Sequence, residues 1–293
     1  MEKVGFLGLG IMGAPMALNL LQAKVPLTVS DLNPDAVHRL VSAGAAQGTN
    51  REIAETSDII ITILPNGTVV KEVLLEMIPY LRPGQIVCDM SSVTPYESRQ
   101  CADRLNQLQV AYMDAPVSGG EPGAKSGTLA IMCGGEQADF DRLLPVFHIL
   151  GNSATLVGGI GCGSIAKLAN QIIVNLNIAA LSEALVFAAK VGADPEKVFH
   201  AISSGLAGST VMRDKAPMML EHNFVPGGKI AINLKDIRNA VGTAHEYSVP
   251  IPMSEQLLTI MEQLAADGHL GDDHSGIIQY FEQMAGIDVS KSK

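Results

Sequence analysis

The chain has 293 residues, of which 47% are hydrophobic and 17% charged, so it can form one large domain or two ordinary ones. The net charge of −10 and the lack of Trp argue against a nucleic-acid binder, which usually has a basic surface and aromatic stacking platforms. No run of about 18 consecutive apolar residues occurs, which predicts that a membrane is not a partner.

The cysteines predict a reducing compartment. Cys88, Cys101, Cys133 and Cys162 are widely spaced and form no C-x-x-C pair, which is typical of buried thiols rather than disulfides or a metal site. The segment Met1–Phe6 lacks the cationic start and long apolar stretch of a secretory signal. We therefore expect a cytoplasmic protein.

Short β-branched runs alternate with helical patterns over the first half of the chain. A strand at Lys3–Leu7 is followed by a helix at Met12–Ala23, a strand at Pro26–Ser30 and a helix capped by Asn33. Further strands are expected at Asp58–Leu64, Gln85–Cys88, Val110–Asp114, Thr128–Cys133 and Ala154–Val157. This alternation predicts an α/β domain with a mostly parallel sheet over residues 1–161.

The pattern changes after Gly161. From Gly163 to Lys190 the chain has no Pro and no further Gly, and apolar residues recur at helical spacing. A helix of about 28 residues would be about 40 Å long, as a helix between two domains would be. Another helix begins at Asp194-Pro195, and helical patterns follow over 212–221, 234–246, 252–266 and 274–286. We expect an all-α domain for substrate binding and oligomerisation over residues 162–293.

A glycine-rich loop lies between the first strand and the first helix. Its sequence, Gly8-Leu9-Gly10-Ile11-Met12-Gly13, has the G-x-G-x-x-G spacing of a dinucleotide-binding loop. Gly8 allows a tight turn, Gly10 lets a pyrophosphate approach the backbone, and Gly13 lets the helix pack closely on the strand. The N–H groups at the helix start, including those of Ile11 and Met12, would bind the anion. The loop predicts a Rossmann-type domain.

An acidic residue stands where the same motif needs one. Asp31 follows the second strand, and its carboxylate could accept hydrogen bonds from the ribose hydroxyls of NAD and repel the 2′-phosphate of NADP. No Arg follows it, so NAD is favoured, with NADP left open. The alternative is a turn or cap residue before Pro34.

Three motifs in order resemble the β-hydroxyacid dehydrogenase family: Gly8–Asn19, Asp114–Gly120 and Lys167–Asn170. Lys235-Asp236 extends the resemblance into the C-terminal third. Within the family, four segments resemble reductases of a small 2-hydroxy-3-oxo acid: Ser118–Pro122, Gly205–Thr210, Lys215–Met218 and Asp273–Ser275. The resemblance implies reversible hydride transfer with NAD or NADP, an anionic semialdehyde substrate, and a homodimer or homotetramer.

The resemblance also assigns the residues that carry the chemistry. Lys167 would be the general acid or base, and Asn170 would share its helix face. The loop Ser118-Gly119-Gly120 would bind the substrate carboxylate through a hydroxyl and exposed N–H groups.

Further residues would complete the cofactor site. Leu64, Pro65 and Ser92 follow apparent strands and would border the cofactor. Lys235 would reach cofactor or substrate from the helical domain, with Asp236 orienting it. A surface ion pair is the alternative for Lys235 and Asp236.

Other functions remain as alternatives. Within the enzymes, 3-hydroxyisobutyrate dehydrogenase or another short-chain semialdehyde reductase fits the same motifs. A non-catalytic NAD-binding sensor would need only the glycine loop, so the joint presence of Lys167, Asn170 and Ser118 favours an enzyme. The seven His residues form no H-x-x-x-H or H-E-x-x-H pair, so we expect no catalytic metal.

Overall fold

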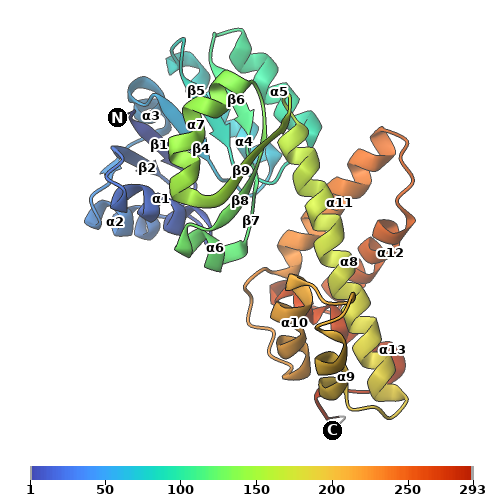
Figure 1. Cartoon of the computed structure of the whole chain (residues 1–293). Helices are drawn as coiled ribbons and strands as arrows, with labels where there is room; N and C mark the ends of the chain where they lie inside the picture. The colour runs from blue at the N-terminus through green and yellow to red at the C-terminus, as the bar shows by residue number, and fades with distance from the viewer. Residues whose placement is uncertain (1, 292–293) are drawn as a thin grey trace. The chain divides into compact units, whose positions relative to one another are not determined.

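A computed structural model describes residues 2–291 and divides the chain into two compact units, Met1–Lys167 and Leu168–Lys293. Both units are seen in Figure 1.

One mixed sheet forms the centre of the first unit. Over the described residues its order is β3-β2-β1-β4-β5-β6-β8-β7, with β9 paired to β8. β1 to β6 run parallel to one another, whereas β8 runs antiparallel to β6 and β7 and parallel to β9. The mostly parallel sheet is therefore confirmed. The strands are β1 (Val4–Leu7), β2 (Leu27–Ser30), β3 (Ala46–Gln47), β4 (Ile59–Thr62), β5 (Ile86–Asp89), β6 (Ala111–Asp114), β7 (Val117–Ser118), β8 (Leu129–Gly134) and β9 (Gly151–Gly158).

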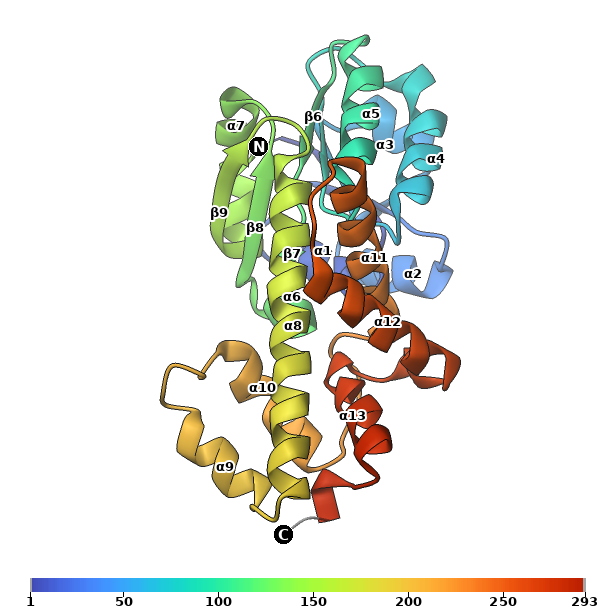
Figure 2. The ribbon, with the colours of Figure 1, turned by 90° about the vertical axis from the view of Figure 1, so that its right-hand side faces the viewer.

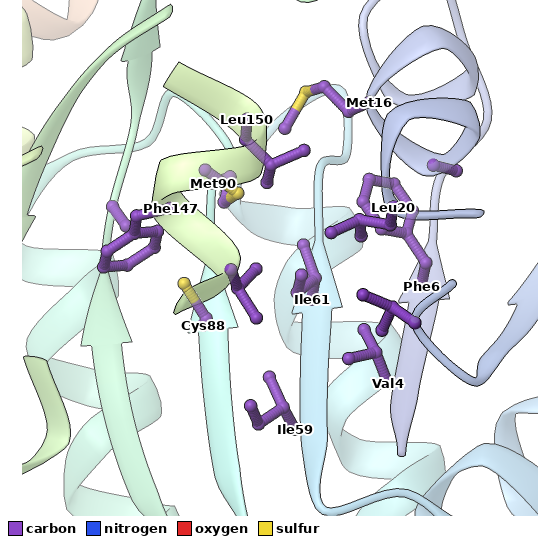
Figure 3. Packing of buried hydrophobic residues seen from close by; sticks show 14 of the residues in the cluster. Val4, Phe6, Met16, Leu20, Ile59, Ile61, Cys88, Met90, Phe147 and Leu150 are labelled. Atoms are coloured by element: carbon purple, nitrogen blue, oxygen red, sulfur yellow. The ribbon is translucent and has the colours of Figure 1, made fainter. Parts of the chain in front are cut away.

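Helices cover both faces of this sheet. They are α1 (Gly13–Gln22), α2 (Pro34–Ser42), α3 (Asn50–Thr56), α4 (Gly67–Met77), α5 (Pro95–Asn106), α6 (Gly120–Ser126) and α7 (Gln137–Leu150), with a 3₁₀ turn η1 (Ile78–Tyr80) after α4. On one face, Met16 and Leu20 of α1 and Phe147 of α7 pack against strand residues such as Phe6 and Ile61 (Figure 3). On the other face, α3, α4 and α5 contribute a second buried apolar cluster. Burial on both faces explains the near-continuous apolar runs of the central strands.

Local caps explain where several helices begin. Asn33 accepts a hydrogen bond from the Asp35 N–H at 3.0 Å, and Pro34 occupies the first turn of α2, as predicted. Thr49 and Thr94 each form a capping box with a glutamate three residues later, which fixes the starts of α3 and α5.

The second unit is helical, as predicted. α8 (Cys162–Lys190) begins in the first unit and continues into this one. α9 and α10 lie on one side of its second-unit part, and α12 and α13 lie on the other (Figure 2). Their core contains Leu185, Met219, Ile237 and Met261. The remaining elements are α9 (Pro195–Ile202), α10 (Thr210–Leu220), α11 (Ile230–Glu246), α12 (Pro252–Ala266), η2 (His269–Gly271), η3 (His274–Ile277), α13 (Ile278–Ala285) and η4 (Val289–Lys291).

α8 is long and apolar enough to cross a membrane by length and composition alone. One such helix is weak evidence, because the core helix of a soluble protein meets the same criterion. The polar residues Ser164, Asn175 and Ser182 on α8 are fully buried.

All four cysteines are free thiols. Cys88, Cys101 and Cys133 are buried, whereas Cys162, the first residue of α8, is half-buried.

Candidate functional site

The glycine loop between β1 and α1 depends on the absence of side chains. Gly8 has a left-handed φ of +98°, and a Cβ there would overlap the carbonyl oxygen of Ile63. A Cβ on Gly13 would overlap the carbonyl oxygen of Gly8, so this glycine permits the close approach of helix and loop. A Cβ on Gly10 would meet no protein atom within 4 Å. Gly10 therefore leaves open space beside the backbone, as a bound pyrophosphate requires.

The backbone of this loop offers donors to an anion. Gly8 N–H is bonded to the Ser30 carbonyl at 3.1 Å, and Leu9 N–H is bonded to Asp31 Oδ2 at 2.5 Å. Gly10, Ile11 and Met12 come next and lead into α1, whose N-cap is Met12, and N–H groups at a helix start lack partners within the helix. The donors and the space at Gly10 fit the diphosphate of NAD(P).

Asp31 is held in place by two backbone amides. Its Oδ1 accepts from Asn33 N–H at 2.7 Å, while Oδ2 accepts from Leu9 N–H. Each carboxylate oxygen has two acceptor sites, so both can still accept from a hydroxyl group. The carboxylate lies at the carboxyl end of β2, directly beside the glycine loop.

The loop lies where the order of the sheet changes direction. β1 pairs with β2 on one side and β4 on the other, and ligands of open α/β sheets bind at such a point. Leu64 and Pro65 follow β4, and Leu64 N–H donates to Ser91 Oγ at 2.8 Å. Ser92 follows Ser91 after β5. These segments lie at the carboxyl ends of neighbouring strands, and their roles toward the cofactor stay predictions.

The buried carboxylate of Asp89 stabilises the carboxyl ends of these strands. Asp89, at the end of β5, accepts from Thr62 Oγ1 at 2.8 Å, Ser91 N–H at 3.0 Å and Tyr112 OH at 3.2 Å. Burial raises the pKa of Asp89, and the bonds from Ser91 and Thr62 oppose that rise. The network ties together the ends of β4, β5 and β6. The run Asp89-Met90-Ser91-Ser92 follows a predicted strand, but nothing in the sequence indicates which groups bind Asp89. Its role was therefore not predicted.

The structure brings Lys167 to the predicted substrate loop. Lys167 Nζ donates to the carbonyl oxygen of Val117 at 2.9 Å, directly before Ser118. Gly119 and Gly120 follow with left-handed φ values of +137° and +59°. Gly119 is the N-cap of α6 and has no side chain to bond the first N–H groups of that helix. Backbone N–H groups of this loop are therefore expected to bind the carboxylate.

Asp114 fixes the start of the helix that carries Lys167. Its two carboxylate oxygens accept from Gly161 N–H and Ser164 N–H, each at 2.7 Å. Burial raises the pKa of Asp114, and these two backbone bonds counteract the rise. Asp114 begins the family-like motif Asp114–Gly120, but the motif alone indicates no role for its carboxylate.

Asn170, Lys235 and Asp236 lie in one polar network of the second unit. Asn170 Nδ2 donates to Gln171 Oε1 at 3.0 Å, and Gln171 Nε2 donates to Asp236 Oδ2 at 2.7 Å. Lys235 Nζ lies 3.2 Å from Asp236 Oδ1. Gln171 Nε2 also donates to Asn233 Oδ1 at 3.1 Å. Gln171 and Asn233 are buried linkers that the sequence did not reveal.

A second network surrounds the fully buried Asp273. Lys215 Nζ contacts its two carboxylate oxygens at 2.8 and 3.1 Å, and Gly227 and Gly228 N–H each donate to Oδ2 at 3.0 Å. Asp273 also caps η3 through Ser275 N–H. The network fixes the chain that enters α11, the helix of Lys235.

Family models match both halves of the chain. Residues 3–159 match the NAD binding domain of 6-phosphogluconate dehydrogenase, and residues 161–281 match the NAD-binding domain of NADP-dependent 3-hydroxyisobutyrate dehydrogenase. The first match agrees with the glycine loop and makes the first unit an NAD(P)-binding domain.

Relatives match over nearly the full length. The chain is 43% identical to 2-hydroxy-3-oxopropionate reductase of Escherichia coli, over 97% of this chain and 98% of that protein. It is 36% identical to 2-(hydroxymethyl)glutarate dehydrogenase of Eubacterium barkeri, over 98% and 97%. Among solved structures, 3-hydroxyisobutyrate dehydrogenase of Mycobacterium tuberculosis, a structure with L-serine, has a TM-score of 0.91 and 29% identity, covering 96% of this chain and 99% of that one.

Proposed function

The chain belongs to the 3-hydroxyisobutyrate dehydrogenase-like family of NAD(P)-dependent oxidoreductases acting on CH–OH groups, and from this premise we propose that it reduces tartronate semialdehyde to D-glycerate. The contact of Lys167 Nζ with the carbonyl before Ser118 carries the proposal, because it brings a proton donor to the loop suited to an anionic substrate. The 43% identity to 2-hydroxy-3-oxopropionate reductase, whose named substrate is the same semialdehyde, supports this choice of substrate.

Lys167 acts as the general acid in the proposed reduction. When bound, the reduced nicotinamide supplies the hydride that reaches the aldehyde carbon. The ammonium of Lys167 hydrogen-bonds the aldehyde oxygen, stabilises the negative charge that grows there and donates the proton that completes the alcohol. In the reverse direction the neutral amine accepts that proton. Asn170, one helical turn further along α8, binds the same oxygens or orients the lysine.

Ser118, Gly119 and Gly120 bind the substrate carboxylate. The hydroxyl of Ser118 and the N–H groups after Gly119 supply hydrogen-bond donors without a side chain to block the approach. Local donors of this kind can hold an anion although the whole chain has a net charge of −10.

NAD is the preferred cofactor in this proposal. Two backbone amides fix the Asp31 carboxylate, so it cannot easily turn away from a 2′-phosphate. Substituting Asp31→Ala should raise the KM for NADH about 10–100-fold, which corresponds to the loss of hydrogen bonds to a charged group. The KM for NADPH should stay unchanged or fall. Equal losses with both cofactors would contradict the preference.

A steady-state panel tests the reaction itself. Tartronate, methylmalonate and succinate semialdehydes and glyoxylate are each reduced with NADH and with NADPH, and kcat/KM is compared. The highest value is expected for tartronate semialdehyde with NADH. A preference for methylmalonate semialdehyde would instead assign a 3-hydroxyisobutyrate dehydrogenase. No turnover of any substrate, combined with tight NADH binding, would favour a sensor.

We also propose a homodimer or homotetramer. Ile173 and Phe187 of α8 are 63% and 66% exposed, and a second copy of the chain would cover these large apolar side chains. Light scattering during size-exclusion chromatography measures the mass directly, and a monomer at micromolar concentration would contradict this proposal.

A further inference from the structure

Three side chains of types that can ligate a metal converge in the second unit, and none belongs to the networks described above. His222 lies two residues after the end of α10, Glu282 lies on α13 and Asp288 follows α13. His222 Nε2 lies 2.8 Å from Glu282 Oε1 and 3.3 Å from Asp288 Oδ1. One ligand atom from each residue lies within 4.8 Å of the other two. The three groups can therefore reach one ion with small side-chain movements.

These side chains border a cavity of about 300 Å³. Its lining includes a second imidazole, that of His269, and a third carboxylate, that of Asp267. Neither Lys nor Arg is among the nine described residues that line it. The space accommodates an ion with water molecules completing its coordination, and the surplus of carboxylates favours a cation.

The candidate ligands are oriented by neighbouring groups. Val289 N–H donates to Glu282 Oε1 at 2.7 Å, and Ser290 donates to Asp288 Oδ1 through N–H at 3.0 Å and through Oγ at 2.6 Å. The His222 backbone has a left-handed φ of +50°, and its ring packs against Phe224 with centroids 5.3 Å apart. Hydrogen-bonded and packed ligands of this kind are typical of metal sites.

We propose that His222, Glu282 and Asp288 form a binding site for a divalent transition metal, with Zn²⁺ as the ion that fits best. One imidazole nitrogen and two carboxylate oxygens make a three-ligand set, and a water molecule from the cavity takes the fourth position. Mg²⁺ and Ca²⁺ fit less well because they prefer oxygen ligands alone. Lys291 pairs with Asp288 through Oδ2, whereas Oδ1 faces His222, and binding of the ion through Oδ1 would replace the hydrogen bond from Ser290 Oγ.

The bound ion has a structural effect in this proposal. It connects the end of α10 to the segment after α13, so it holds the C-terminal turn η4 against the unit. The site takes no part in the proposed reduction. Its test therefore does not depend on which substrate the protein uses.

The experiment uses the full chain without a histidine tag, freed of metal by a chelator and dialysis. Isothermal titration with Zn²⁺ is expected to give one equivalent bound, and Co²⁺ is expected to give the visible absorption of a low-symmetry site. His222→Gln and Asp288→Asn should each weaken Zn²⁺ binding at least about 10–100-fold, the range seen when even supporting residues of a metal site are lost. Both substituted side chains are partly exposed, so the variants should fold, as circular dichroism will check.

His245→Gln is the matched control. His245 Nε2 lies 2.9 Å from Glu255 Oε1, which nearly equals the His222–Glu282 distance, but this pair is not part of a three-ligand group among the described residues. The control should bind Zn²⁺ as the parent chain does. Absence of stoichiometric binding by the parent chain, or binding that survives His222→Gln, would overturn the proposal and leave a simple histidine–carboxylate ion pair.

Discussion

The two units hold their carboxylates in different ways. In the first unit, Asp31 and Asp114 accept hydrogen bonds from backbone N–H groups, and Asp89 accepts from one backbone N–H and from the hydroxyls of Thr62 and Tyr112, so the donors are uncharged. In the second unit, Asp236 is bound by the side chains of Gln171 and Lys235, and Asp273 by that of Lys215 in addition to backbone amides.

This difference has a physical origin. Backbone N–H groups near Asp31 and at the start of α8 have no partner in regular secondary structure, so the carboxylates of Asp31 and Asp114 accept from them. The helices of the second unit use most of their backbone groups internally, and the side chains of Lys215 and Lys235 supply donors to Asp273 and Asp236. The first arrangement relies on uncharged donors, and the second adds an ammonium group to each carboxylate.

The largest expected effect is the loss of catalysis without loss of fold. Lys167→Ala removes the ammonium that donates to the Val117 carbonyl, and thermal melts check that the fold is retained. Its turnover number should fall by about 10²–10⁴-fold, the usual contribution of a general acid. NADH binding, followed by fluorescence, should be retained.

A surface lysine provides the control for that experiment. Lys197 has an 84% exposed side chain paired with Asp194, and Lys197→Ala should keep full activity. Full turnover in Lys167→Ala would remove the proton-donor role while leaving the family membership intact.

The next effect is a loss of stability in the second unit. Asp273→Asn leaves the ammonium of Lys215, whose side chain is only 16% exposed, without its charged partner. The free energy of unfolding should fall by about 3–5 kcal/mol, as expected for one partner of a buried ion pair. Urea denaturation at neutral pH measures this change. Glu262→Gln, which breaks an exposed pair with Arg238, should cost less than about 1 kcal/mol.

The free energy of unfolding that Asp273 contributes should fall as the pH is lowered. Burial would raise the pKa of Asp273, but hydrogen bonds from Lys215 and Ser275 outweigh it and hold the pKa below its ordinary value of 3.8. The stabilisation is therefore complete above the ordinary pKa and is lost as the pH falls through the folded value. The difference between the parent chain and Asp273→Asn should narrow below pH 3.8. A difference that is constant with pH would mean that charge plays no part.

Two substitutions in the glycine loop should have a smaller effect, and they distinguish the stability of the fold from the affinity for NADH. Gly13→Ala places a Cβ against the Gly8 carbonyl and should cost about 1–3 kcal/mol of stability as well as NADH affinity. Gly10→Ala meets no protein atom within 4 Å, so it should weaken NADH binding with little change in melting temperature. Titration calorimetry and thermal melts distinguish the two. Equal losses of stability in both variants would contradict this division.

The first unit was largely predictable because its signals are local. The spacing of Gly8, Gly10 and Gly13 and the position of Asp31 are visible within a short stretch of chain, and so is the capping of α2 by Asn33. The strands β3 and β7 were missed because two residues are too few to show alternation. The family resemblance identified from the motifs is confirmed by the full-length relatives.

The second unit was predictable in its helices but not in its polar contacts. Gln171 and Asp236 are 65 residues apart, and Lys215 and Asp273 are 58 apart, so no spacing rule connects them. The metal-binding spacings known from sequence place two His within one helical turn. They do not reveal the proposed ligands His222 and Glu282, which lie 60 positions apart.

The buried thiols make the chain suitable for labelling at one place without mutagenesis. Burial raises the pKa of Cys101 and Cys133 to about 12 and that of Cys88 well above its ordinary value, so these groups hardly form the reactive thiolate at neutral pH. Cys162 is the half-buried one, five residues before Lys167 on the same helix. A fluorophore attached there would report on the helix that carries the proposed acid, in solution and during turnover.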